Sequence, residues 1–158
     1  MYLKEKAQNW LKYSLNDPMV KILAKNSNLT KIQLETLLID VLAENMSDKS
    51  LKYEEKARIR FLAVSRGAFN RSLRQARRNV IQSIYTILLL GYLGILEEIS
   101  LQPYIEAANK LQAYIETQRK IAKKKPKEEH LKIVARLHQE LKRSLEELSK
   151  PRNMSESL

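Results

Sequence analysis

Arginine residues recur at helical spacing in the middle of the chain, between Ser65 and Val80. If this stretch is a helix, with about 100° between successive residues, its apolar residues share one sector. Gly67, Arg71, Arg74 and Arg78 then lie on the opposite side, with Asn70 beside them. The apolar sector consists of Phe69, Leu73, Ala76, Val80, Ile84 and Ile87. Such a stripe can hold the helix on a small core while guanidinium groups point outward. This division is the one required of a helix that lies in the major groove of DNA.

Two kinds of DNA contact are expected from this region. Guanidinium groups donate bidentately to guanine, an asparagine pairs with adenine, and a glycine lets the helix start approach the duplex closely. The residues expected at base edges are Arg66, Gly67, Asn70, Arg71 and Arg74. The residues expected at phosphates, which position the protein without specifying a sequence, are Lys56, Arg58, Arg60, Ser65, Arg77 and Arg78. The alternative is a solvated basic face, which is less favoured because almost no acidic residues lie one turn from these arginines.

The positive charge of the chain is concentrated in two patches. The net charge is +11 over 158 residues. Residues 52–82 carry nine lysines and arginines against two glutamates, and residues 119–132 carry seven against two. Concentrated positive charge attracts phosphate polymers and acidic surfaces. The run at 119–127 could hold the DNA backbone beyond the main site, or it is a solvated linker; the sequence leaves both open.

The composition predicts an all-α fold with few turns. Glycine (3) and proline (4) are scarce, while long charged residues are abundant. A helix is expected from about residue 51 to residue 62, with Phe61 and Leu62 available for the core. Only Ala63-Val64 separates it from the helix that Ser65 caps. Because helices joined by so short a turn cross at a large angle, this region is expected to be a helix-turn-helix.

An earlier helix is predicted from a capping-box pattern. Thr30 and Gln33 have the spacing at which a threonine hydroxyl and a glutamine amide satisfy each other's backbone amides. The helix is expected to run to about Asn45. Its expected inward residues are Leu34, Leu37, Leu38, Val41 and Leu42.

Two stretches resemble the fourth conserved region of bacterial sigma factors. Leu29-Thr30-x-x-Gln33-x-Glu35-x-Leu37 looks like the opening of that region, and the segment from Leu62 to Arg77 is similar to its turn and recognition helix. The resemblance covers about residues 29–80. It implies sequence-reading DNA contact by the base-edge residues named above, and it adds RNA polymerase or another transcription component as a candidate partner. The turn position usually held by glycine is Ala63, where a left-handed backbone would cost about 1 kcal/mol.

An uncharged segment follows the arginines. No charged residue occurs from Asn79 to Leu96, and residues 84–96 are nearly all apolar. A helix that is apolar all round is expected to be buried on all sides, so this segment should thread the centre of the fold and continue into a subunit interface. Gly91 or Gly94 would allow a bend or a close helix contact. A membrane span is disfavoured because the apolar run is shorter than the ~20 residues that a bilayer requires.

The C-terminal region is expected to form two more helices, at about residues 103–125 and 128–148. The second has a heptad seam: Leu131, Val134, His138, Leu141, Leu145 and Leu148. An antiparallel hairpin, a coiled coil with another subunit, or both would bury this seam. The expected organisation is a helix-turn-helix domain at 1–99 with its reader at 51–80, a hairpin or oligomerisation region at 100–150, and a disordered tail at 151–158.

Motifs of enzyme chemistry are not found in the sequence. There is no cysteine, no glycine-rich phosphate loop, no nucleophile elbow, and only two histidines, which lack a third metal ligand of the right kind. We therefore expect no catalytic activity, no cofactor and no metal, and a cytoplasmic location, since the N-terminus has no signal-peptide pattern. The predicted function is sequence-specific binding of double-stranded DNA by a homodimeric transcriptional regulator. The alternatives are a helical adaptor for an acidic protein or RNA, and membrane association.

Overall fold

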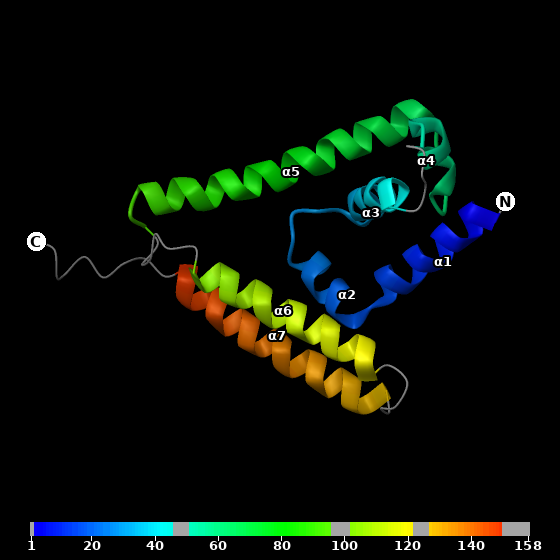
Figure 1. Cartoon of the computed structure of the whole chain (residues 1–158). Helices are drawn as coiled ribbons and strands as arrows, with labels where there is room; N and C mark the ends of the chain where they lie inside the picture. Colours follow the sequence, from blue (N-terminus) through cyan, green and yellow to red (C-terminus); the bar gives the residue numbers. More distant parts are fainter. Residues whose placement is uncertain (1, 46–50, 96–101, 122–126, 150–158) are drawn as a thin grey trace, which may run out of the picture. The chain divides into compact units, whose positions relative to one another are not determined.

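The computed structural model of the chain describes residues 2–45, 51–95, 102–121 and 127–149, and these residues form α-helices and no strand (Figure 1). The all-α prediction is confirmed for this part of the chain. The chain divides into two compact units, one ending at Tyr85 and the other beginning at Thr86. Since the boundary falls within a long helix, that helix contributes residues to both units.

The first unit contains four helices and most of a fifth. They are α1 (Tyr2–Asn16), α2 (Pro18–Lys25), α3 (Lys31–Asn45), α4 (Tyr53–Ile59) and α5 (Arg66–Tyr92). Helix α1 packs against α2, α3 and α4, and α3 also packs against α4. The core of the unit consists of Ala7, Leu11, Ile39, Leu42, Ala57, Ile59, Phe69 and Leu73. Residues from α1, α3, α4 and α5 therefore share one core.

Local capping interactions begin three of these helices. In the predicted capping box, the Gln33 N–H donates to Thr30 Oγ1 (3.2 Å) and the Thr30 N–H donates to Gln33 Oε1 (3.0 Å). The Asp17 carboxylate accepts from the Val20 N–H (2.9 Å) at the start of α2. The Ser65 hydroxyl accepts from the Ala68 N–H (3.2 Å) at the start of α5. The predicted starts of α3 and α5 are thus confirmed, because these bonds depend only on neighbouring residues.

The buried side of α3 matches the expected one in part, because Leu37 and Leu38 pack against the core as expected. Ile39 and Leu42 are in the core, but Val41 is exposed, and the buried positions also include Glu35 and Asp40. Burial of two carboxylates requires cationic partners. Those partners come from α4, from the segment after it and from α5, so contacts distant in sequence decide which side of α3 faces inward.

The connection between α4 and α5 is longer than predicted. Helix α4 ends at Ile59, and residues 60–65 form a six-residue connector where only Ala63-Val64 was expected. Phe61 and Leu62 lie on this connector and are exposed, so their expected place in the core was wrong. The connector also turns without a left-handed residue, because no non-glycine residue in the described chain has a positive φ.

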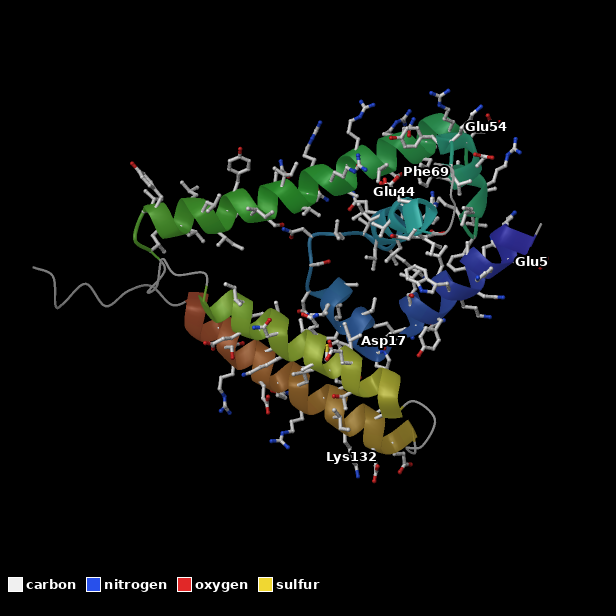
Figure 2. All side chains as sticks on the ribbon, in the orientation of Figure 1. Glu5, Asp17, Glu44, Glu54, Phe69 and Lys132 are labelled. Carbon is white, nitrogen blue, oxygen red and sulfur yellow. The ribbon has the colours of Figure 1, made fainter. Side chains whose placement is uncertain are left out.

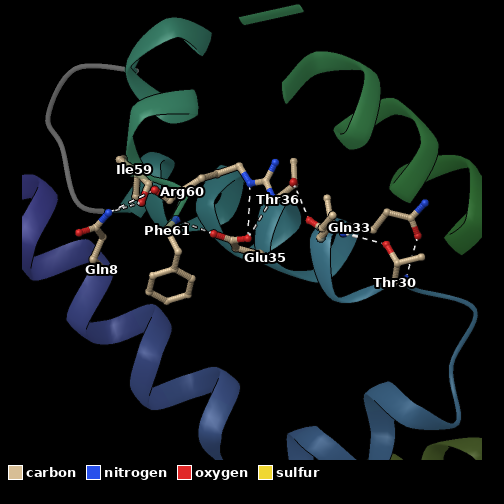
Figure 3. A network of polar contacts seen from close by, with 9 residues as sticks. Gln8, Thr30, Gln33, Glu35, Thr36, Ile59, Arg60 and Phe61 are labelled. Atoms are coloured by element: carbon tan, nitrogen blue, oxygen red, sulfur yellow. Dashed lines mark hydrogen bonds and ion pairs between the residues drawn. The ribbon is translucent and has the colours of Figure 1, made fainter. Parts of the chain in front are cut away.

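Side chains from α1 and α3 hold the start of this connector (Figure 3). Gln8 Nε2 donates to the carbonyl oxygens of Ile59 (3.0 Å) and Arg60 (3.2 Å), and the Phe61 N–H donates to Glu35 Oε1 (2.8 Å). These bonds satisfy backbone groups that a continued α4 would have paired within itself. This is the physical reason why α4 stops at Ile59.

Helix α5 is buried only along its first part. Phe69, Leu73 and Ala76 are buried as predicted, whereas Val80 and Ile84 are exposed. The expectation that its apolar half threads the centre of the fold was wrong, whereas its expected continuation into a subunit interface stays a prediction. At 1.5 Å per residue, α5 is about 40 Å long and α3 about 22 Å, so α5 extends beyond the helix it packs against. None of the helices in the described residues combines the length and apolar character that a bilayer crossing needs.

Gly94 provides the end of α5. It has φ +67°, the Gly94 N–H donates to the Gly91 carbonyl (3.1 Å), and the Ile95 N–H donates to the Leu90 carbonyl (3.0 Å). This is a Schellman motif, in which a glycine takes the left-handed position that other residues adopt at a cost. Gly94 therefore terminates the helix.

The second unit contains a hairpin of two helices, α6 (Gln102–Ile121) and α7 (Lys127–Ser149), which pack against each other and run antiparallel (Figure 1). Among the hairpin residues whose side chains the structure describes, the buried ones are Tyr114, Val134 and Leu141. The Tyr114 ring stacks on the His130 ring with 6.1 Å between centroids. Of the alternatives that the sequence left open, the hairpin is formed. Residues 122–126 of the basic run at 119–127, and the predicted tail at 151–158, lie outside the described residues.

Candidate nucleic-acid interface

One side of α5 presents cationic side chains to solvent. The residues that we call the arginine face are Gly67, Arg71, Arg74 and Arg78, and all four are exposed. Arg66 lies about 100° from Gly67 around the helix and lines a separate groove with Asp40, Glu44 and Glu54. The opposite side carries Phe69, Leu73 and Ala76, whose side chains are buried. Figure 2 shows nitrogen-tipped side chains projecting from α5 away from α3. The two-sided helix predicted from the arginine spacing is therefore present in its N-terminal part.

The cations of this face are not neutralised by acidic side chains. Within the described part of the chain, no carboxylate forms an ion pair with its three arginines or with Arg66. Helix α5 itself contains no acidic residue. Arg66 also lies in the first turn of the helix, where the helix dipole disfavours a cation by about 0.3–1 kcal/mol. This concentration of like charge makes an anionic partner favourable.

A shallow groove lies beside the arginine face. It has a volume of about 480 Å³, and its lining includes Tyr53, Asn70, Arg74, Arg78 and Ile81. Asn70, expected at a base edge, is half-buried in this groove. Tyr53 was not among the candidates from the sequence, although an aromatic residue next to a basic cluster is a known feature of nucleic-acid sites. With Arg77, which also lines it, the groove places an amide, an aromatic ring and three guanidinium groups together.

Lys56 does not lie on the surface. It was expected at a DNA phosphate, but it is only 5 % exposed, and its Nζ lies 2.8 Å from Asp40 Oδ1. Its ammonium group also lies 5.3 Å from the centre of the Tyr53 ring. The expected outward orientation of Lys56 was wrong, because Asp40 is buried and requires a nearby cation.

Arg60 is buried in the same way. It is 7 % exposed, and its guanidinium donates to Glu35 Oε2 from Nε (3.4 Å) and from a terminal nitrogen (3.2 Å). Figure 3 shows this pair between α3 and the connector, where Glu35 also binds the Phe61 backbone. The expectation that Arg60 points outward was wrong, since its charge is used to hold the connector on α3.

The other residues expected at phosphates remain near the surface, and all of them except Arg78 have partners within the protein. A terminal nitrogen of Arg77 lies 2.6 Å from Asp40 Oδ2, although its side chain is 55 % exposed. Arg58 pairs with Glu54 at 3.0 Å, with both side chains exposed. The Ser65 hydroxyl caps α5. Only Arg78 of the expected phosphate contacts is therefore an exposed cation without a carboxylate partner in the described residues.

Two acidic residues that were not among the candidates from the sequence decide which cations are buried. Asp40 holds Lys56 and Arg77, and Glu35 holds Arg60, although both acids lie far from these cations in sequence. For Asp40 a signal was present, because it interrupts the apolar run from Leu37 to Ala43 in α3. An acid at such a position is buried only with a cationic partner.

Together, these features define an all-helical protein in which a small core supports one cationic helix face. Comparison of the chain with profiles of known protein families, with curated protein sequences and with solved structures found no match. Any functional proposal therefore depends on the geometry of the described residues.

Proposed function

We propose that this protein binds double-stranded DNA through the arginine face of α5 and acts as a transcriptional regulator. The observation that carries the proposal is a row of exposed arginines without carboxylate partners, on a helix held by its opposite side. A helix of this kind fits the major groove, where guanidinium groups read guanine bidentately. The proposed base-edge residues are Arg66, Gly67, Asn70, Arg71 and Arg74.

In this proposal, α4, the connector and α5 form a helix-turn-helix. The connector of six residues is longer than the usual turn of three or four, so it does not by itself force a large crossing angle. The ion pair of Arg60 with Glu35 and the bonds from Gln8 hold it instead. Arg78 and the exposed part of Arg77 would contact phosphates, which position the helix in the groove.

The first experiment selects a preferred duplex from random oligonucleotides and follows its binding by fluorescence anisotropy. Arg71→Ala is expected to weaken binding by about 1–3 kcal/mol and to relax the preference at one base position, because a bidentate contact is lost. The wild-type affinity should fall with salt on a logarithmic plot, with a slope of about −0.9 for each phosphate contacted.

The matched control is Arg143→Ala, which removes an exposed arginine from α7. Its effect should be less than about 0.5 kcal/mol, since exposed charges distant from the duplex are largely screened. Equal losses for the two variants, or an affinity independent of salt, would contradict the proposal. If the selection yields no preferred duplex while an acidic protein co-purifies at fixed stoichiometry, the protein is an adaptor instead.

We also propose that the protein is a dimer, paired through the apolar part of α5. Ile81, Ile84, Tyr85, Leu88 and Leu89 are each more than half exposed, and contiguous apolar surface of this kind is rare on monomers. Sedimentation velocity over about a hundredfold range of concentration should show a dimer that dissociates on dilution.

The variant that tests this pairing carries Leu88→Asp and Leu89→Asp, and it is expected to be a monomer throughout, because two carboxylates in the interface would be desolvated. Tyr13→Asp changes a large residue of α1 that is even more exposed, at 76 % against 56 % for both leucines, and should leave the dimer intact. A wild-type protein that sediments as a monomer at every concentration would refute the pairing.

A further inference from the structure

A cavity of about 640 Å³ lies in the first unit, away from the arginine face. Its lining comes from α1, α2, the segment leading into α3, the start of α3 and Phe61 of the connector, and no residue of α5 takes part. Its volume is within the range of small-molecule sites in proteins. The proposed DNA contact does not use this cavity.

The wall of the cavity is mostly apolar. Its apolar residues are Leu15, Val20, Ala24, Leu29, Leu34 and Phe61. Phe61 is 46 % exposed, and the other five are half-buried. When an apolar ligand covers apolar side chains that are accessible to solvent, the free energy of the system falls. An apolar body is therefore the part of a ligand that this wall favours.

Lysines surround this apolar wall. They are Lys12, Lys21, Lys25 and Lys31, and all four are exposed. No acidic residue lines the cavity, and none of these lysines has an ion-pair partner in the described part of the chain. A cavity with several ammonium groups and no carboxylate attracts an anion. The acidic group of a ligand would be held here, at the edge of the apolar wall.

We propose that this cavity binds a free organic acid with a long apolar body, of the fatty-acid type. The apolar wall would cover the body, and the lysines would pair with the acid group. The ligand would also contact Phe61, whose backbone N–H is bound by Glu35 (2.8 Å), so it would touch the connector that leads into α5. The site does not depend on DNA binding.

The experiment is calorimetric titration of the full chain with dodecanoate below its micellar concentration. Binding with a dissociation constant in roughly the micromolar range is expected. Decanoate should bind about 16-fold more weakly, at about fourfold for each methylene lost. The neutral alcohol of the same length and the dodecyltrimethylammonium cation should both bind more weakly than dodecanoate, because neither pairs with a lysine.

Two variants place the binding in this cavity. Lys21→Glu with Lys25→Glu should weaken dodecanoate binding by about tenfold, whereas Lys4→Glu with Lys6→Glu, which changes the net charge equally on exposed positions outside the cavity, should change it less than about twofold. Ala24→Trp should abolish binding by filling the cavity. Circular dichroism verifies that each variant is folded. If Ala24→Trp does not fold, dodecanoate binding by the variant with Lys21→Glu and Lys25→Glu tests the site instead.

Several results would overturn the proposal. They are no binding of dodecanoate by the wild type, equal weakening by the two charge-reversed pairs, equal affinity for the alkyl cation, and binding only to vesicles of anionic lipid. Arg71→Ala, which tests the proposed DNA contact, should leave dodecanoate binding unchanged. The two proposals can therefore fail separately.

Discussion

Asp40→Asn is expected to lower the free energy of unfolding by about 3 kcal/mol, because it leaves the Lys56 ammonium buried beside a neutral amide. Lys56 and Asp40 have side chains only 6 % and 7 % exposed, and their charged atoms lie 2.8 Å apart. Arg77, the second partner of Asp40, is more than half exposed. Its lost ion pair should add less to the destabilisation, because water can solvate its guanidinium. Urea denaturation followed by circular dichroism measures the change.

Glu54→Gln is the matched control for Asp40→Asn. It removes the same charge from an ion pair of similar length, between Glu54 and Arg58, whose side chains are about two-thirds exposed. Its cost should be less than about 0.5 kcal/mol. Adding Lys56→Met to Asp40→Asn should restore at least about 1.5 kcal/mol, because no buried cation then remains. Equal costs for Asp40→Asn and Glu54→Gln would contradict the buried pair.

Glu35→Gln is expected to cost about 3 kcal/mol and to loosen the connector locally. Glu35 holds the Arg60 guanidinium through one oxygen and the Phe61 N–H through the other, with both charged side chains 8 % exposed. The variant leaves Arg60 buried without a negative charge. Hydrogen exchange should therefore become faster at the Phe61 amide than at amides of the first turn of α3, and urea denaturation gives the overall cost.

The control for this prediction is Glu44→Gln, which neutralises an exposed acid on the same helix. It should leave both the stability and the Phe61 amide nearly unchanged. If the Phe61 amide of Glu35→Gln exchanges as slowly as in the wild type, Glu35 does not hold the connector. If Glu35 and Arg60 form a buried pair, adding Arg60→Met to Glu35→Gln should restore part of the lost stability, because no buried cation then remains. No recovery of stability would contradict the pair.

Interactions between near neighbours explain which parts of this fold were predictable. The caps at Thr30 and Ser65 depend on groups three residues away, so their residue types are enough to predict them. The same holds for the first part of α5, where the spacing of Phe69, Leu73 and Ala76 predicts the buried side. The apolar part of α5 was mistaken for core, because the apolar pattern does not show where the packing helices end.

The residues alone determined an all-α chain, the start of α5 and the side of it on which arginines collect. The tertiary structure decided which cations remain available to a partner. In the sequence, Lys56 and Arg60 looked like outward-facing cations, as Arg71 and Arg74 did. In the folded chain, Lys56 pairs with Asp40, 16 positions away, and Arg60 pairs with Glu35, 25 positions away. A helical pattern relates residues within a few turns, whereas a buried ion pair forms between helices only after the chain has folded. For that reason, the arginine face could be predicted and its boundary could not.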